Sequence, residues 1–501
     1  MMANRIPVSS IRRALLILLV AAIPSLAAFI LIASQANFLS FSPTWSDEIF
    51  YWHQILTFKA AAFQGGYYTI NEAGAAATFT HFYTYGPWFV MIYGVLARLV
   101  GWERITFILF NMCYVTGALV LFCKTIRIQG RQFILLAVML GTFWCLVAFL
   151  LTAMQESFQQ ALAILIATVF YVVFKYREKI VWKWYISGAI ILAVAALLRI
   201  SWAILFFPFL WLTTRPRLIW RLGSLMLGVI VFMVIYALTQ YTGSPGNNSI
   251  TSIVDKFFTS FSAGWSSFWD YFTHNLTSFV DTRKQPLDLL QTAQIVVFMV
   301  GMLTVAVFAA VYKQLSYEAL FHLYNLGATI LISCAFYIIA TWGDYRVLGT
   351  HLMVSLLLLI AFKRYLPIYL FVITNVLFIA VFYGYFQTEI LPKYQVDVPA
   401  INSLHNQIES VASYHPDTTN AWCNTIIFQV ETFDTSLTAV PAGMGLSFFK
   451  DANVPGYRSQ YVLVNQYIYD IIERMPNHPE LKPILTTSLG TLYHNLSAKC
   501  S

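Results

Sequence analysis

The sequence predicts an all-α polytopic membrane protein of about eleven transmembrane helices, with juxtamembrane helices in its first outer loop and a small C-terminal extracytoplasmic α+β domain. Of the 501 residues, 59% are hydrophobic and only 10% are charged, whereas soluble domains carry about a quarter. Apolar stretches near membrane length recur up to residue 386. In lipid they must be helical, because every backbone polar group needs an internal partner. Residues 387–501 have an ordinary soluble composition.

The first predicted span is the apolar run 14–34, which follows Arg5, Arg12 and Arg13. A cleaved signal peptide is the alternative, and Ala33-Ser34-Gln35-Ala36 resembles a cleavage site. The run is longer than a typical signal core, so we expect a retained helix whose N-terminus is cytoplasmic.

The remaining spans follow from the other apolar runs of the first 386 residues. They are 105–123, 132–151, 158–174, 185–198, 202–214, 219–239, 290–312, 319–341, 346–362 and 365–386. The two spans near residue 200 are short, and a polar interruption at Arg199 separates them. We interpret them as half-length helices that meet at the outer surface.

The distribution of charge supports this order of spans. About half of the 30 lysines and arginines fall in the N-terminal segment and in short loops that the order places in the cytoplasm, as the positive-inside rule requires. Among the acidic residues, only Glu178 and Glu318 fall inside. An odd number of spans leaves the C-terminus extracytoplasmic, and we expect a multi-pass protein of a bacterial inner (plasma) membrane.

One further apolar run, from Pro87 to Trp102, would break this alternation if it crossed the membrane. It also contains Arg98, and Glu103 follows it. We expect a helix that lies in the outer interface or enters the membrane only partway.

The spans divide the chain into a transmembrane catalytic domain, 1–386, and an extracytoplasmic C-terminal domain, 387–501. Two long outer loops belong to the first domain: 35–104, with the interfacial helix, and 240–289, which is polar and aromatic and holds Trp265, Trp269, Tyr271 and His274. In the C-terminal domain, Trp422 to Val430 predicts a strand and Tyr461 to Glu473 a helix. Three N-x-S/T sequons fall in outer regions, which agrees with this topology: Asn247, Asn275 and Asn495.

Composition also argues against several classes of function. The net charge of +8 is split among short loops without a basic face, so no nucleic-acid partner is expected. None of the six cysteines has a CxxC or Cys/His metal spacing. Cys423 and Cys500, in the tail, either pair or remain free thiols. No P-loop, HExxH, GxSxG or Gly-rich nucleotide loop is present, and no cytoplasmic segment could form a nucleotide-sugar domain. A transferred group would therefore come from a membrane-bound donor.

Two adjacent carboxylates, Asp47 and Glu48, follow the first span. Ser46 and Asp47 suit a helix N-terminus, so the pair could simply belong to a solvated loop or a helix cap. Alternatively, a carboxylate at the rim of a membrane cavity could act as a general base or bind a metal or a hydroxyl group. Side chains at i and i+1 of a helix diverge, so the two acids need not share a role.

Five other positions are candidates at the same membrane face. Glu156 lies between two apolar spans, as a surface turn residue or a functional acid. Arg199 and Arg346 lie at outer ends of spans, where they could snorkel or grip a phosphate group in bidentate fashion. Asp344 could pair with Arg346. His81, in the stretch before Gly86-Pro87, could be an interfacial anchor or part of an acceptor site.

In the order of these motifs, the chain resembles the GT-C superfamily of integral-membrane glycosyltransferases, and within it the protein O-mannosyltransferase and aminoarabinose-transferase type. The resemblance covers roughly residues 1–386. Its motifs are the acidic pair in Ser46-Asp47-Glu48, the aromatic stretch from His81 to Tyr93, the acid of Gln155-Glu156, and Tyr345-Arg346 at the outer start of a span. The chain departs from the family where relatives have His-Pro-Pro or Lys-Pro-Pro, since Phe-Tyr-Thr-Tyr follows His81.

The resemblance implies an inverting hexosyl- or pentosyltransferase that uses a polyprenyl-phosphate sugar donor in cell-envelope glycan biosynthesis. It implies Asp47 as general base with Glu48 in support, Arg346 and Arg199 at the donor phosphate, and Glu156 at the acceptor. Partners would be the donor, membrane lipids and a glycan, lipid or protein acceptor. No cofactor is predicted, and a divalent metal stays open.

Two other functions remain as alternatives. A secondary transporter or flippase of a lipid-linked sugar usually has ionisable groups or broken helices near the bilayer midplane. In this sequence the notable charges cluster at one face, and no inverted repeat is present. A non-enzymatic assembly or receptor protein would bind its partner through the tail.

Overall fold

The computed structural model describes residues 8–32, 46–64, 86–176, 182–213, 218–242, 249–281, 285–311, 317–332, 341–394, 425–429, 438–441, 459–487 and 490–498, and the single positions 399, 403, 406 and 407. His81, Cys334, Cys423 and Cys500 lie outside the described residues.

Up to residue 394 the described chain is helical. Its elements are α1 (Val8–Ile32), α2 (Ser46–Ala61), η3 (Ala62–Gln64), α3 (Trp88–Val100), α4 (Arg104–Ile126), α5 (Arg131–Thr142), α6 (Trp144–Val147), η4 (Ala148–Leu151), α7 (Glu156–Tyr176), α8 (Trp182–Leu198), η5 (Ile200–Leu205), α9 (Phe206–Thr213), α10 (Leu218–Thr242), α11 (Ser249–Thr259), α12 (Phe261–Val280), α13 (Pro286–Val311), α14 (Tyr317–Leu331), η7 (Trp342–Tyr345), α15 (Arg346–Ala361), α16 (Tyr365–Tyr385), η8 (Phe386–Ile390) and α17 (Leu391–Tyr394).

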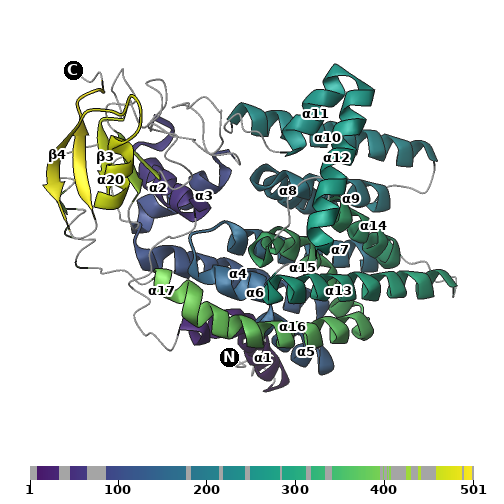
Figure 1. Ribbon diagram of the computed structural model, residues 1–501. Coiled ribbons are helices and arrows are strands. Elements are labelled where there is room, and N and C mark those ends of the chain that lie inside the picture. Colours follow the sequence, from purple (N-terminus) through teal and green to yellow (C-terminus); the bar gives the residue numbers. More distant parts are fainter. Residues whose placement is uncertain are drawn as a thin grey trace.

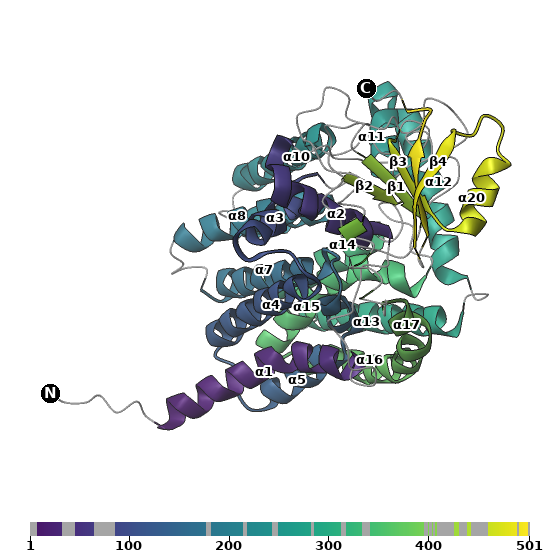
Figure 2. The same cartoon turned by 90° about the vertical axis from the view of Figure 1, so that its left-hand side faces the viewer.

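The long helices form a stack (Figure 1), with α4, α7 and α15 in its middle, α10 near one edge and α1 near the other (Figure 2). In α7, 89% of the most apolar window of membrane length is buried, and the same share is buried in the helix Gly343–Ala361, which ends with α15. The shares in α1 and α10 are 39% and 22%. α7 and α15 are therefore the core helices, and the outer ones present their apolar side chains to lipid.

Seven helices among the described residues are long and apolar enough to cross a membrane. They correspond to the predicted spans that begin at residues 14, 105, 158, 219, 290, 346 and 365. Predicted span 132–151 is a pair of helices bent by 62°, and the two near residue 200 are short, as expected. Of predicted span 319–341, the described part forms α14 and ends at residue 332. The expected fold class, a helical multi-pass membrane protein, is confirmed.

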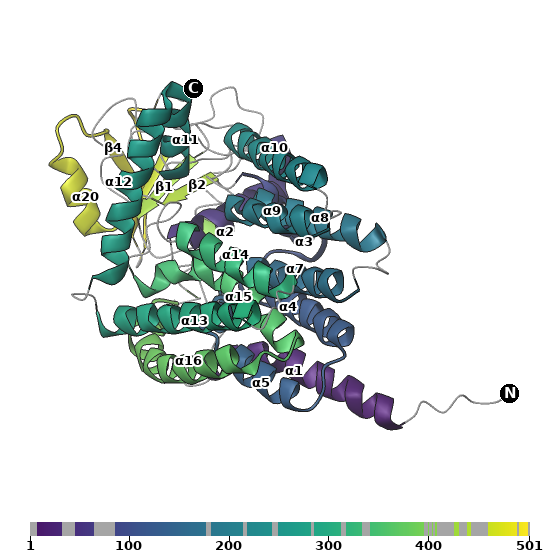
Figure 3. The same cartoon turned by 90° about the vertical axis from the view of Figure 1, so that its right-hand side faces the viewer.

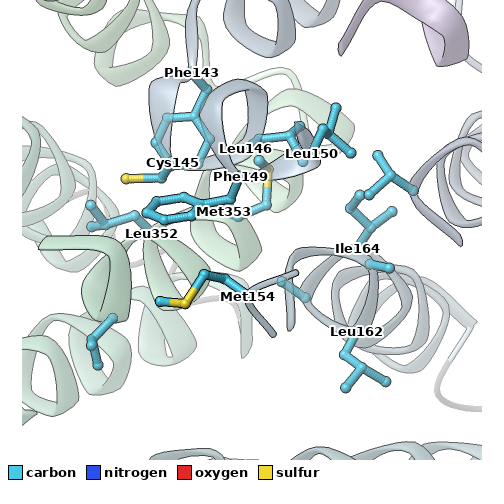
Figure 4. Close-up of a cluster of buried hydrophobic side chains, with 14 of the residues drawn as sticks. Phe143, Cys145, Leu146, Phe149, Leu150, Met154, Leu162, Ile164, Leu352 and Met353 are labelled. Atoms are coloured by element: carbon cyan, nitrogen blue, oxygen red, sulfur yellow. The ribbon is translucent and has the colours of Figure 1, made fainter. Parts of the chain in front are cut away.

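The bend within span 132–151 lies at Phe143, whose backbone is extended (φ −77°, ψ 92°). The segment after it is buried, and Gly349 of α15 allows a close approach: a Cβ atom there would lie 2.8 Å from Cβ of Cys145. The buried side chains that meet at this point include Phe143, Cys145, Leu146, Phe149, Leu150, Met154, Leu162, Ile164, Leu352 and Met353 (Figure 4). This packing fixes the segment that leads into α7.

The C-terminal part contains a five-stranded sheet and helix α20 (Gln466–Glu473). The strands are β1 (Thr425–Gln429), β2 (Thr438–Pro441), β3 (Tyr461–Val464), β4 (Leu481–Thr486) and β5 (Thr491–Asn495), in the spatial order β2-β1-β3-β5-β4. β1 is parallel to β2 and β3, whereas β5 is antiparallel to β3 and β4. The predicted α+β composition is confirmed.

Within this domain, the strand expected between Trp422 and Val430 is present as β1. The helix expected from Tyr461 to Glu473 is wrong in its first third, because Tyr461 to Val464 form the buried central strand β3. Asn465 then caps α20 by accepting a hydrogen bond from the amide of Ile468 at 2.9 Å. A short run of consecutive apolar residues fits a buried helix as well as a strand that is buried on both faces. For Tyr461 to Val464, the strand is correct.

The sheet lies at the end of the stack opposite to the start of α1 (Figures 2 and 3). We call this the sheet-side end. Helix α2 contacts β2 there, and α12 runs across the long helices at the same end (Figures 2 and 3). The sequons do not mark exposed asparagines in the described part, since Asn275 and Asn495 are buried; Asn247 lies outside it.

Candidate functional site

Four of the predicted site residues come together although their helices are far apart in sequence. Asp47 lies in the first turn of α2, Glu156 begins α7, Arg199 precedes η5, and Arg346 begins α15. Each side chain is therefore at a helix terminus, where the packed bundle positions it firmly and where loop sequence can supply polar groups.

Arg346 and Arg199 share the carboxylate of Glu156. Nε of Arg346 lies 3.2 Å from Oε1 of Glu156, and Nη2 of Arg199 lies 2.9 Å from the same oxygen. Nη2 of Arg346 also donates to Oδ2 of Asp47 at 3.0 Å. The four side chains form one continuous ion-pair network, which we call the arginine–carboxylate cluster.

The cluster runs from a wet edge to a dry interior. The side chains of Asp47 and Arg346 are 24% and 18% exposed, whereas those of Glu156 and Arg199 are 3% and 2% exposed. Glu156 is thus not the surface turn residue that was one alternative. The two guanidinium groups and the two carboxylates balance in charge, so an anionic ligand that arrives from the edge would bind Arg346 by replacing Asp47 as its partner.

Glu48 faces another direction from Asp47, as expected for neighbouring helix positions. Its side chain is completely buried, and its Oε1 accepts a hydrogen bond from the amide of Ala153 at 2.7 Å. This bond ties α2 to the segment between η4 and α7, which carries Gln155 and Glu156. The contact gives Glu48 a supporting position next to the cluster.

The segment that carries Arg199 is held by side chains from α7 and α15. Nε1 of Trp202 donates to Oε1 of Gln159 at 2.5 Å, and the Trp202 indole stacks on the His351 ring with centroids 4.6 Å apart. The amide of Gln155 bonds both Gln159 and the hydroxyl of Tyr51 in α2. The sequence had assigned no role to Trp202, Gln159 or His351. The glutamine side chains near the start of the apolar run that becomes α7 were the available signal.

Asp344 caps the short helix η7. Its Oδ2 accepts hydrogen bonds from the backbone amide and the hydroxyl of Thr341, at 2.8 and 2.9 Å. The guanidinium of Arg346 also donates to the carbonyl of Gly343 at 3.4 Å. Asp344 thus completes the capping box of η7, whose N-cap is Thr341, and shapes the turn before Arg346.

The described carboxylates and histidines do not form a metal site in this arrangement. Within the part of the chain that the structure describes, no group of three or more His, Cys, Asp or Glu side chains has the geometry to hold a metal ion. Asp47 and Glu156 are ion-paired to arginines.

No protein-family model and no curated protein matches the chain. Among solved structures, the crystal structure of ArnT from Cupriavidus metallidurans bound to undecaprenyl phosphate aligns with 96% of this chain and 99% of that chain, at 13% sequence identity and a TM-score of 0.41.

Proposed function

We propose that this protein is a membrane glycosyltransferase that moves a sugar from a polyprenyl-phosphate-linked donor to an acceptor hydroxyl, with inversion at the sugar carbon. The observation that carries the proposal is Arg346, which bridges Asp47 and Glu156 at distances of 3.0 and 3.2 Å. This bridge brings the group that would bind a phosphate and the group that would accept a proton to one point.

In this reaction, the acceptor oxygen attacks the anomeric carbon as the bond from that carbon to the phosphate oxygen breaks. The acceptor proton passes to Asp47, and the electron pair of the broken bond stays on the lipid phosphate. Arg346 and Arg199 stabilise the charge that develops on this leaving group, as preorganised cations do in other active sites. Asp47, at the more exposed edge, is placed to meet the acceptor.

Arg346 cannot pair fully with a donor phosphate and with Asp47 at the same time. Its Nε and Nη2 atoms face carboxylates, and its Nη1 atom faces a carbonyl. A donor phosphate that takes Nη2 would release Asp47 from its ion pair and make this carboxylate a better proton acceptor. Donor binding would thereby activate the base, while Glu156 keeps Arg346 and Arg199 in place.

The other site residues have supporting roles in this proposal. Glu48 holds the segment before α7, Asp344 shapes the turn before Arg346, and His81 belongs to the acceptor side. The sheet-side end would be extracytoplasmic, with the N-terminus in the cytoplasm of a bacterial inner membrane. The C-terminal domain, which contacts α2, would then cover the acceptor side. The sugar is a hexose or pentose, and the acceptor a glycan, lipid or protein.

The direct test uses purified protein in lipid nanodiscs with a panel of polyprenyl-phosphate sugars. Mass spectrometry should detect release of free polyprenyl phosphate with one of them, and Asp47→Asn should lose at least a hundredfold in rate, on the order of a general-base contribution. Asp270→Asn, which changes an exposed acid of α12, is the matched control. Equal release by Asp47→Asn and the wild type would exclude Asp47 as the base.

A second candidate, proton-coupled transport of a lipid-linked sugar, is favoured by one observation. A buried polar line runs between α14 and α15: Asn325 donates to Ser355 at 2.6 Å, Ser355 meets His322 at 3.4 Å, and His322 lies 3.9 Å from Glu318. Buried ionisable groups in spans occur in proton relays. Sugar-lipid counterflow in proteoliposomes without any chemical product, lost in His322→Gln, would favour transport over transfer.

A further inference from the structure

Helix α12 differs from the long helices in direction and in surface. It runs across them at the sheet-side end (Figures 2 and 3). It is followed almost directly by α13, one of the helices long enough to span the membrane. Its 20 residues extend about 30 Å at 1.5 Å per residue. A long helix that crosses the spans at their end lies roughly in the plane of a membrane surface.

The helix exposes two different faces. Side chains at steps of three and four residues form an apolar stripe: Phe261, Trp265, Phe268, Trp269, Phe272, Leu276 and Val280. Beside the stripe lies an exposed polar face: Ser262, Ser266, Asp270, Thr273, His274 and Thr277. The third side packs on the protein through Gly264, Ser267, Asn275 and Phe279, which are buried. The apolar stripe is not a core face.

The stripe is a continuous ladder of rings. The centroids of Phe261 and Trp265 are 6.3 Å apart, those of Trp265 and Phe268 are 5.5 Å apart, and those of Phe268 and Phe272 are 6.0 Å apart. Helix α11 extends the ladder with Phe257, whose ring is 5.8 Å from that of Phe261. Phe258, beside it, is 74% exposed.

The hairpin of α11 and α12 has the features of a fixed element. The Ser260 hydroxyl caps α12 by accepting a hydrogen bond from the amide of Ala263 at 3.1 Å. Gly264 allows the helices to touch, because a Cβ atom there would lie 2.3 Å from the Phe257 ring. The aromatic ladder is therefore presented in one orientation.

Only one environment satisfies both exposed faces. In water the aromatic stripe would stay exposed at a cost, and in the hydrocarbon layer Asp270 would be expensive. At the membrane–water boundary, Trp and Phe rings lie among the lipids while polar side chains remain hydrated. We propose that the α11–α12 hairpin is seated in the interfacial layer of the lipid bilayer at the sheet-side end, with its aromatic stripe in the lipid and its polar face in water.

The position of the hairpin in the membrane also sets the depth of the candidate site. The buried ring of Phe279, near the end of α12, lies 6.1 Å from the ring of Tyr345. Tyr345 precedes Arg346 and shares a hydrogen bond with Thr292 of α13. A hairpin at the boundary therefore places Arg346 near the level of lipid headgroup phosphates. This last step rests on the proposed function, whereas the seat of the hairpin does not.

The test measures depth in the membrane and uses no substrate, so its failure is independent of the proposed reaction. Full-length protein without its six native cysteines would carry one spin label at a time in phosphatidylcholine–phosphatidylglycerol nanodiscs. Labels at Trp265→Cys, Trp269→Cys and Leu276→Cys should collide more with oxygen than with a water-soluble nickel chelate. Labels at Ser266→Cys, Thr273→Cys and Thr277→Cys should show the reverse. Nickel access at both faces, or at neither, would overturn the proposal.

If the protein without cysteines does not fold, the native chain gives a second reading. In bilayers with brominated acyl chains, Trp265→Phe/Trp269→Phe should lose part of the tryptophan emission that bromine quenches. Trp144→Phe, which removes a fully buried ring, is the control and should leave the quenched part unchanged. An equal quenched part in the double variant and the wild type would contradict the seat.

Discussion

The guanidinium of Arg346 lies 3.0 Å from the carboxylate of Asp47, across 299 positions of sequence. The two residues lie in the first turns of separate helices, α2 and α15, and Glu156 at the start of α7 joins Arg346 to Arg199. An ion pair at the edge of a membrane protein is partly screened and adds little stability. Its importance lies in what could replace it, which in our proposal is the phosphate of a lipid.

The carboxylate of Glu156 stabilises the fold at the inner end of the cluster. It is the ion-pair partner of Arg199 and, with Asp47, of Arg346, so its loss removes the buried carboxylate that the two arginines share. We expect Glu156→Gln to lower the free energy of unfolding by about 3–5 kcal/mol, measured as a loss of thermal stability in detergent. Glu389→Gln, at an exposed position of η8, should change it little. Equal stability of both variants would contradict the role assigned to Glu156.

Substitution of the carboxylate by an amide should have a smaller effect at Glu48 than at Asp47. The Glu48 side chain accepts a hydrogen bond from a backbone amide, and a glutamine oxygen can accept the same bond. We expect Glu48→Gln to keep most of the transfer rate and Glu48→Ala to lose about 1–3 kcal/mol of stability through the unpaired amide. Rate measurements and thermal unfolding of both variants test this. A rate loss in Glu48→Gln as large as that in Asp47→Asn would assign Glu48 to the reaction itself.

The buried His53 of α2 should make the free energy of unfolding depend on pH. Burial lowers the pKa of His53 from 6.5 to about 3, so the unfolded chain binds a proton below pH 6.5 that the folded chain does not bind. Stability should therefore fall as the pH drops below 6.5, by about 2 kcal/mol at pH 5. Thermal unfolding between pH 7.5 and pH 5 measures the loss, and His53→Gln should reduce it. An unchanged pH profile in that variant would contradict the contribution of His53.

The hydrogen bonds of the polar line between α14 and α15 should stabilise the packing of these two helices. Nδ2 of Asn325 donates to Ser355 at 2.6 Å and to the His351 carbonyl at 3.0 Å. A double-mutant cycle of Asn325→Ala and Ser355→Ala should give a coupling energy of about 0.6–2 kcal/mol. Thermal unfolding in detergent supplies the four values. Strict additivity would show that the two side chains do not stabilise each other.

Much of the membrane fold followed from the sequence because lipid imposes long apolar helices and a sided charge distribution. The same charges located Asp47, Glu156, Arg199 and Arg346 at a common face. Their contacts were a different matter, since the sequence could not say that Glu156 would be shared by two arginines. Pairing depends on helix rotation, which the packing of Gly349 on Cys145 helps to set.

The failures have physical causes as well. The apolar run Tyr461 to Val464 became a strand because β1 and β5 pair with it on both sides, which is information from outside the run. The polar interval 240–289 contained the amphipathic α12, but glycine, serine and aromatic residues gave it weak helix propensity.

The most direct measurement compares donor binding with turnover in two variants at the ends of the 3.0 Å contact. If the donor phosphate competes with Asp47 for Arg346, then Asp47→Asn should bind the polyprenyl-phosphate sugar at least as tightly as the wild type, while its transfer rate falls at least a hundredfold. Arg346→Ala should weaken donor binding by about 10- to 100-fold, as the loss of a charged hydrogen bond would. Weaker donor binding in Asp47→Asn, or unchanged transfer by it, would contradict the account.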